Sequence, residues 1–271
     1  MRYTVTVNAV HTDATVPPPS ISGYTPDWGK PYPFWKALGF GIAIYAVALY
    51  GAWIATSFLQ LGITQLSLRN LDKILMGPPD EALLRQGLWF GLASCVTGIL
   101  GIFLVREVIL QSEAPPRAYF GAGRLKLRQS ATYLLLCALW VAIPHLVLRL
   151  LTGSTVSVYW IDTFRSARPQ YPLWLGLVVL APLFEEMLFR GLLFTGARQT
   201  WLSARGAVVL TAVLFAITHY RYGVIGTLWI LLFGLLLGIA RHRSDTIKLP
   251  ILMHTVSNFL ILLLMNHATT A

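Results

Sequence analysis

Residues 87–110 read GLWFGLASCVTGILGIFLVREVIL, and this run decides the fold class. Only Arg106 and Glu107, near its end, are charged. An α-helix rises about 1.5 Å per residue, so about 20 consecutive apolar residues cross the hydrocarbon core of a bilayer. The run therefore predicts one membrane-spanning helix.

Similar apolar runs lie on both sides of it, at about 34–62, 131–151, 172–196, 206–220, 224–240 and 249–266. The chain is 56% hydrophobic and 12% charged, with a mean hydropathy of +0.64. A water-soluble domain carries about twice that charged fraction. We therefore predict an all-α protein, a polytopic transmembrane helical bundle of about seven helices. The number rises to eight if residues 152–171 contain another crossing.

The remaining parts of the chain suggest a simple domain organisation. Residues 1–33 are polar, contain Pro17, Pro18 and Pro19, and have no early apolar stretch of the kind that a cleavable signal peptide needs. We interpret them as a flexible N-terminal tail, followed by a membrane-embedded domain over 34–271. Cys95 and Cys137 both fall inside apolar runs, which favours small buried side chains over a disulfide framework or a cysteine metal site.

The net charge of +10 would suggest a nucleic-acid partner in a soluble protein. Here the basic residues lie mostly at the edges of apolar runs, so we predict a lipid bilayer and no nucleic acid as the partner. Of the 21 Lys and Arg residues, 13 lie in the N-terminal segment and every second loop after it, and 7 lie in the other loops. Because positive segments stay in the cytoplasm, the N-terminus is predicted inside and the C-terminus outside.

The run at 172–196 carries the chemistry. It contains Glu185, Glu186 and Arg190, and each ionisable group inside a membrane costs about 3 kcal/mol or more unless it finds a partner or water. Glu186 and Arg190 are four residues apart on one helical face, so they can form an ion pair. Glu185 is rotated by about 100° from Glu186 and is the more available carboxylate. Pro182 lacks an amide hydrogen and loosens the helix just before the acidic pair.

Two later runs add polar groups. His219 ends the fifth run, and His254 and Asn258 lie one helical turn apart on one face of the seventh. A single intramembrane histidine is often a packing residue, but three separate helices that each offer polar groups point to one shared site. Counted from the predicted helix ends, Glu185 and His219 lie about 20 Å from opposite faces of the membrane. They are expected to meet only if one helix is shorter, tilted or shifted.

These motifs, Glu-Glu-x-x-x-Arg, Phe-x-x-x-His and His-x-x-x-Asn, together resemble the CPBP family of CAAX prenyl proteases, bacteriocin-processing and abortive-infection proteins. The resemblance covers about 172–266 and implies an intramembrane endopeptidase that cleaves a hydrophobic or membrane-anchored peptide. It implies an activated water held by Glu185 and His219, and an oxyanion held by His254 and Asn258, with Glu186 and Arg190 orienting the site. The spacings are typical of bacterial members. They imply a bacterial inner (plasma) membrane location and make a prenylated substrate less favoured.

Metal dependence is open at this point. Glu185, His219 and His254 are the candidate zinc ligands, but the sequence contains no His-Glu-x-x-His. Current readings of the family favour a glutamate-activated water, so we predict a glutamic peptidase with no cofactor and keep zinc as the alternative. Two other functions also fit intramembrane ionisable residues: a catalytically silent scaffold related to the family, and a proton-coupled transporter. Transporters usually show two related halves. Here the polar residues are confined to one half of the chain.

Overall fold

The computed structural model describes residues 29–64, 87–152 and 158–270, so most of the predicted tail lies outside the described residues. The longer helices are α1 (Phe34–Thr64), α4 (Gly87–Leu110), α6 (Leu127–Thr152), α11 (Ser203–Ile217), α12 (Gly223–Ser244) and α13 (Lys248–Thr270). The shorter ones are α5 (Pro116–Phe120), α7 (Val158–Ser166), α8 (Tyr171–Trp174), η2 (Leu175–Leu180), α9 (Ala181–Glu186), η3 (Met187–Leu193), α10 (Phe194–Ala197) and η4 (Tyr220–Tyr222). The described residues contain no strand, which confirms the all-α prediction.

Each of the seven apolar runs is helical, but they are not seven equal crossings. Five helical stretches are long and apolar enough to span a membrane: Phe34–Leu59, Gly87–Leu110, Leu127–Val147, Tyr220–Ser244 and Lys248–Ala268. The fifth run forms only the 15-residue α11, and the fourth is a helix of several pieces. In the region where an eighth crossing was considered, the described residues form the nine-residue α7, which is too short to cross. The number of seven or eight crossings stays a prediction.

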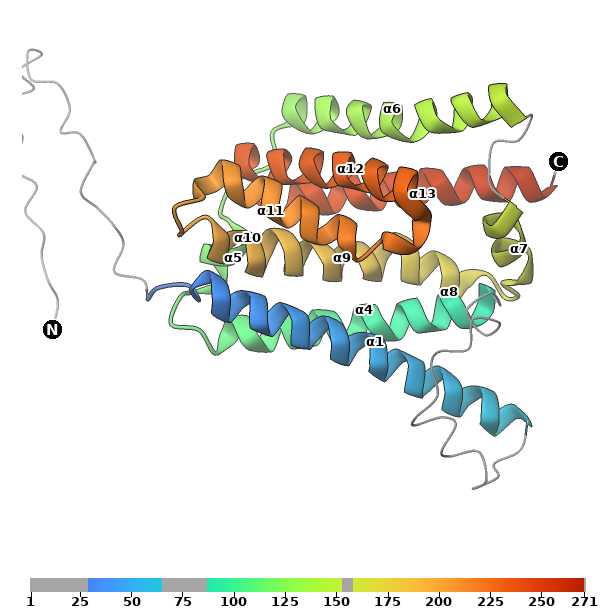
Figure 1. The fold of residues 1–271 in the computed structure, drawn as a ribbon, viewed down its shortest axis with the longest axis horizontal. Coiled ribbons are helices and arrows are strands. Elements are labelled where there is room, and N and C mark those ends of the chain that lie inside the picture. Colours follow the sequence, from blue (N-terminus) through green and yellow to red (C-terminus); the bar gives the residue numbers. More distant parts are fainter. Residues whose placement is uncertain (1–28, 65–86, 153–157, 271) are drawn as a thin grey trace, which may run out of the picture.

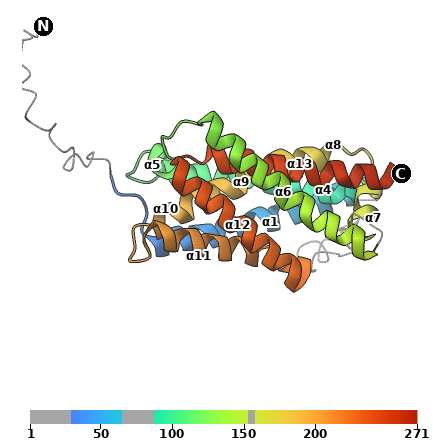
Figure 2. The ribbon, with the colours of Figure 1, turned by 90° about the horizontal axis from the view of Figure 1, so that it is seen from above.

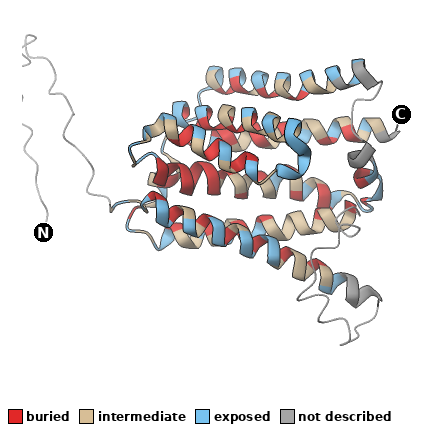
Figure 3. Cartoon of the chain, in the orientation of Figure 1, coloured by how far each residue is buried: buried red, intermediate tan, exposed pale blue. Residues whose placement is uncertain are grey.

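Residues 171–197, from α8 to α10, form the central helical segment of the bundle. In Figure 1, α1 and α4 lie on one side of it, and α11, α12 and α13 lie on the other. Figure 2 shows α6 crossing over α13 on the outside of the bundle. Every residue from 188 to 197 is buried, as the continuous red stretch in Figure 3 shows. A helix that is apolar all round is stable in this position because its neighbours cover every face.

Small residues allow the neighbouring helices to approach this segment and each other closely. A Cβ atom at Gly98 of α4 would lie 2.6 Å from the Cβ of Leu180, and one at Gly101 would overlap the ring of Phe184. Gly234 of α12 lies against Ala212 of α11, where an added Cβ would be 3.1 Å from the Ala212 Cα. Close approach of this kind is the main source of helix association in lipid, where there is no hydrophobic driving force between helices.

The condition set for Glu185 and His219 to meet was a shorter or shifted helix, and the 15-residue α11 is such a helix. The central segment 171–197 is about 40 Å long, more than the bilayer core needs, so a residue near its middle is not tied to one face. Helix α11 begins at the end of the bundle where α10 stops, and ends inside the bundle (Figure 1). Measured from that common end, Glu185 and His219 lie at about 18 and 24 Å.

Candidate active site

The backbone around the acidic pair departs from the ordinary α-helix. Stretches of π-helix, η2 and η3, lie immediately before and after α9, which carries Glu185 and Glu186. In a π-helix each N–H bonds to the carbonyl five residues earlier, as the Ala181 N–H does to the carbonyl of Gly176. The next bond in this register would run from residue 182 to Leu177, but Pro182 has no N–H. The carbonyl of Leu177 is therefore left without its helical donor.

Asn258 of α13 supplies the missing donor. Its Nδ2 donates a hydrogen bond to the Leu177 carbonyl at 2.7 Å. The bond fastens α13 to the π-helical turn just before the acidic pair, because an unpaired carbonyl in apolar surroundings is costly. One Nδ2 hydrogen and the Oδ1 atom of Asn258 remain for other partners. The oxyanion role implied for Asn258 stays a prediction, and the structure adds a positioning role.

Replacing Asn258 by Leu is expected to lower the free energy of unfolding by about 1–3 kcal/mol, because the Leu177 carbonyl then loses its donor. The same replacement should cost clearly less in a Pro182→Ala background, where residue 182 regains an N–H. Unfolding in mixed micelles of mild detergent and SDS, analysed as a double-mutant cycle, measures the coupling. Equal losses in the two backgrounds would contradict the pairing of Asn258 with the proline.

Glu186 is the buried centre of a three-helix polar cluster. Its side chain is fully buried, and its Oε1 accepts hydrogen bonds from Arg190 Nη1 at 3.1 Å and from His254 Nδ1 at 2.9 Å. Arg190 Nη2 donates to the Gly234 carbonyl at 2.9 Å. These bonds connect the central segment to α12 and α13. The ion pair predicted between Glu186 and Arg190 is confirmed.

Glu185 lies on the other side of His254. Because a carboxylate only accepts hydrogen bonds, the bond to Glu186 requires that the proton of neutral His254 be on Nδ1. Its Nε2 then lies 3.8 Å from Glu185 Oε2. The side chain of Glu185 is 16% exposed and that of Glu186 is 0% exposed, which agrees with the prediction that Glu185 is the more available carboxylate. The imidazole of His254 therefore lies between the buried carboxylate of Glu186 and the more accessible carboxylate of Glu185.

His219 joins this cluster through an aromatic ring. The residue follows α11, and its Nδ1 lies 2.9 Å from the carbonyl of Phe215, so Nδ1 carries the proton and Nε2 is left as an acceptor. The Phe215 ring lies 4.7 Å from the His219 ring and 5.7 Å from the His254 ring. The guanidinium of Arg190 lies 4.7 Å from the same ring, at cation–π distance. The Phe215 ring therefore packs against the side chains of Arg190, His219 and His254.

Comparison with known proteins assigns the part of the chain that contains these residues. Residues 167–260 match the family model of the type II CAAX prenyl endopeptidase Rce1-like proteins. This segment is Rce1-like. An uncharacterised 24.3 kDa protein of Escherichia coli is 40% identical over 83 residues, which is 30% of this chain and 38% of that relative. No solved structure matches the chain.

The Rce1-like segment includes all six predicted site residues, and it agrees with the CPBP resemblance of the sequence. The match covers well under half the length of the E. coli protein, so it bears on one part of that relative only. Together with the five apolar helices, it supports an integral membrane protein in which residues 167–260 are similar to the Rce1-like CAAX endopeptidases.

The predicted zinc ligands are not assembled in the Rce1-like segment. Among residues 29–64, 87–152 and 158–270, no three His, Cys, Asp or Glu side chains are grouped closely enough to hold a metal ion. The Nδ1 atoms of His254 and His219 face Glu186 and the Phe215 carbonyl. Glu185, His219 and His254 in these positions do not fit a zinc site.

Two residues around the site carry no signal in the sequence. Tyr45 of α1 stacks its ring on Phe184, the residue before Glu185, with the ring centroids 6.1 Å apart. Arg241 of α12 is buried and donates to the carbonyls of Arg190 and Tyr119, each at 3.1 Å. Arg241 therefore fixes the backbone behind Arg190, whereas its place at the edge of an apolar run indicated only a role in topology.

Proposed function

We propose that the chain is an intramembrane endopeptidase that hydrolyses a peptide bond of a hydrophobic or membrane-anchored peptide with a water activated by Glu185. The observation that supports this proposal best is the pair of carboxylates around His254, one fully buried and one accessible, within the Rce1-like segment. A buried carboxylate that fixes an imidazole, next to a second carboxylate free to take a proton, is an arrangement suited to general acid–base catalysis.

In the proposed reaction Glu185 accepts a proton from a water molecule while the water oxygen attacks the carbonyl carbon of the scissile peptide bond. The carbonyl oxygen gains the negative charge. His254 enters the proposed reaction protonated on both ring nitrogens and keeps both protons: its Nε2–H donates to this oxygen, and its Nδ1–H donates to Glu186, which offsets the positive charge. The C–N bond then breaks, and the proton on Glu185 passes to the leaving amine. His219, whose Nε2 is an acceptor, assists by orienting the water.

Arg190 has a supporting part in this scheme. Its guanidinium binds Glu186 and the Gly234 carbonyl and stacks on Phe215, and its side chain is 0% exposed, so it is not open to a substrate. It holds Glu186 in place, and Glu186 in turn orients His254. Arg190 and Glu186 therefore act as positioning residues, and Glu185, His219 and His254 act on the water and the substrate.

We also propose an orientation for the protein. The ends of α4, α10 and α12 and the beginnings of α1, α6, α11 and α13 lie at one end of the bundle, called here the basic end (Figure 1). Arg198 lies in the connection between α10 and α11 there, and the helical turns next to the connections contain Arg205, Arg241, Arg243 and Lys248. By the positive-inside rule this end faces the cytoplasm of a bacterial inner membrane.

A comparison of protein termini tests the function. Cells that produce the wild-type chain are expected to contain new N- or C-termini, at or near a membrane-spanning or lipid-anchored segment, that are absent from cells producing Glu185→Gln. Mass spectrometry of enriched terminal peptides detects them. Identical termini in the two cell lines would reject the peptidase and favour the silent scaffold. A proton flux that depends on Glu185, without any cleavage, would favour the transporter.

The absence of a metal requirement is a separate prediction. The purified chain is expected to keep its peptidase activity after dialysis against a strong chelator, because Glu185 and His254 are placed to activate water and stabilise the oxyanion without a metal ion. Metal analysis of the purified protein and an activity assay before and after chelation check this expectation. Stoichiometric zinc, with activity lost on chelation and restored by zinc, would contradict it.

A further inference from the structure

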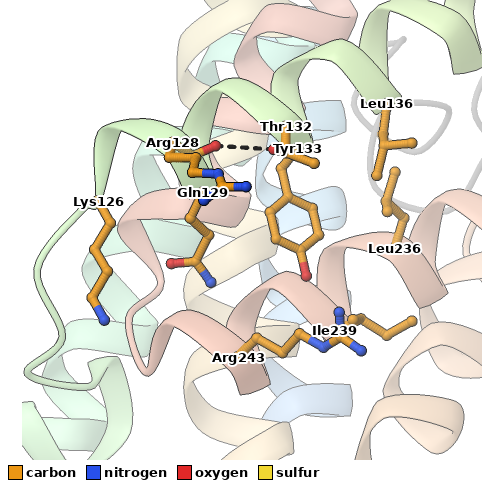
Figure 4. A pocket seen from close by; sticks show the side chains of 9 residues that line it. All are labelled: Lys126, Arg128, Gln129, Thr132, Tyr133, Leu136, Leu236, Ile239 and Arg243. Atoms are coloured by element: carbon orange, nitrogen blue, oxygen red, sulfur yellow. Dashed lines mark hydrogen bonds between the residues drawn. The ribbon is translucent and has the colours of Figure 1, made fainter.

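A second polar feature lies at the basic end, away from the acidic pair. The first turns of α6 and the last turns of α12 enclose a cleft of about 670 Å³ (Figure 4). It is lined by Lys126, Arg128, Gln129, Thr132, Tyr133, Leu136, Leu236, Ile239 and Arg243. Figure 4 shows the side chains of Gln129, Tyr133 and Arg243 directed into the space between the two helices.

The charge in this cleft is of one sign. Lys126, Arg128 and Arg243 line it, and no described Asp or Glu side chain forms an ion pair with any of them. Arg241, two residues before Arg243, differs because it is paired with Asp245 at 3.4 Å. Three cations without a described counterion, beside the hydroxyl group of Tyr133 and the amide of Gln129, form a surface complementary to a phosphate group.

The apolar part of the cleft lies deeper along the same two helices. Leu136 is 41% exposed and Ile239 is 37% exposed. Both belong to helical stretches long enough to cross a membrane, so their exposed surface faces hydrocarbon. One turn beyond Leu136, the ring of Trp140 stacks on Phe233 at 4.2 Å and closes the gap between α6 and α12. The cleft therefore runs from a cationic mouth at the membrane surface to an apolar floor about 15 Å deeper.

We propose that this cleft binds an anionic phospholipid, with the phosphate between Lys126, Arg128 and Arg243 and the start of an acyl chain against Leu136, Leu236 and Ile239. The polarity gradient along the cleft matches that of a lipid molecule in the leaflet at the basic end. Basic pockets between membrane-spanning helices on the cytoplasmic side suit such headgroups. A soluble anion would use the cations alone and leave the apolar half uncovered. The cleft opens outward because α6 is the outermost helix (Figure 1).

Native mass spectrometry of the full chain in a neutral detergent, with phosphatidylglycerol or phosphatidylcholine added, tests the proposal. The wild type is expected to retain phosphatidylglycerol at least about 10-fold more tightly than phosphatidylcholine. The Lys126→Gln/Arg243→Gln variant should lose this preference, since each cation near a headgroup contributes separately. The matched control is Arg149→Gln/Arg165→Gln, which removes the same charge from exposed positions at the opposite end of the bundle and should bind as the wild type does.

A steric variant separates a lipid from a free anion. Ile239→Trp fills the apolar half of the cleft without changing its charge, and it should weaken phosphatidylglycerol binding about as much as the loss of the two cations does. Equal retention of the two lipids would overturn the proposal, and so would unchanged phosphatidylglycerol binding by the charge variant. A third contrary result would be that inorganic phosphate, at the same concentration as the lipid, displaces phosphatidylglycerol while Ile239→Trp leaves its binding unchanged. The last result would identify an anion site instead.

Discussion

Glu185→Gln is expected to reduce peptide hydrolysis by about 10²- to 10⁴-fold while the protein keeps its fold, because an amide of the same shape cannot accept a proton from water. Within the described residues, Glu185 makes no hydrogen bond, and its Oε2 lies 3.8 Å from His254 Nε2. Its removal therefore leaves no buried donor or acceptor without a partner. Cleavage of a purified substrate, with thermal unfolding measured on the same sample, checks both halves of the expectation.

Two further variants make this result specific. Glu107→Gln removes the same charge from a side chain that is 36% exposed and paired with Arg106 at the end of α4, and it should keep full activity. Glu186→Gln should lower both activity and stability, because it breaks the charge pairing with Arg190 and weakens the hold on His254. If Glu185→Gln still cleaves and Glu186→Gln stays folded but inactive, the roles of the two carboxylates are reversed.

The longer helices were predictable because each one coincides with a continuous apolar run of the sequence. The run at 87–110 coincides with α4, and the other apolar runs coincide with helices within a few residues. The pairing of Glu186 with Arg190 was predictable for the same reason, since a spacing of four places two side chains on one face. The exposed fraction of Glu185 relative to Glu186 also followed from their difference in helical rotation.

Features that depend on packing between distant segments were not predictable. Pro182 indicated a loosened helix, but the π-helical register depends on the fit of the central segment against its neighbours. The carbonyl that Asn258 satisfies belongs to Leu177, 81 residues earlier, and no periodicity relates the two. Tyr45 lies in the first apolar run, which matched no motif, yet its ring stacks on Phe184, next to Glu185. Helix α11 is a similar case, because hydropathy predicted an apolar helix there but not how far into the bundle it extends.

Replacing Arg190 by Ala is expected to be the most destabilising single change in the site, lowering the free energy of unfolding by about 3–5 kcal/mol. The guanidinium is fully buried, and its loss leaves the Glu186 carboxylate in apolar surroundings without its charge partner. It also breaks the hydrogen bond to the Gly234 carbonyl of α12 and removes the cation stacked on Phe215. The SDS titration used for Asn258 measures the loss. The control Arg106→Ala, at a side chain 60% exposed, should change stability by less than about 1 kcal/mol.

A compensating variant distinguishes the loss of charge balance from the loss of packing. In Glu186→Gln/Arg190→Met both charges are gone and most of the buried volume is kept, so this variant should recover a large part of the stability lost in Arg190→Ala. It should nevertheless be a poor peptidase, because a neutral amide in place of the Glu186 carboxylate cannot offset the imidazolium of His254 in the reaction. Stability recovered without activity would show that the buried pair serves to hold His254 in its working state. An Arg190→Ala protein with an unchanged unfolding midpoint would instead show that water solvates the pair.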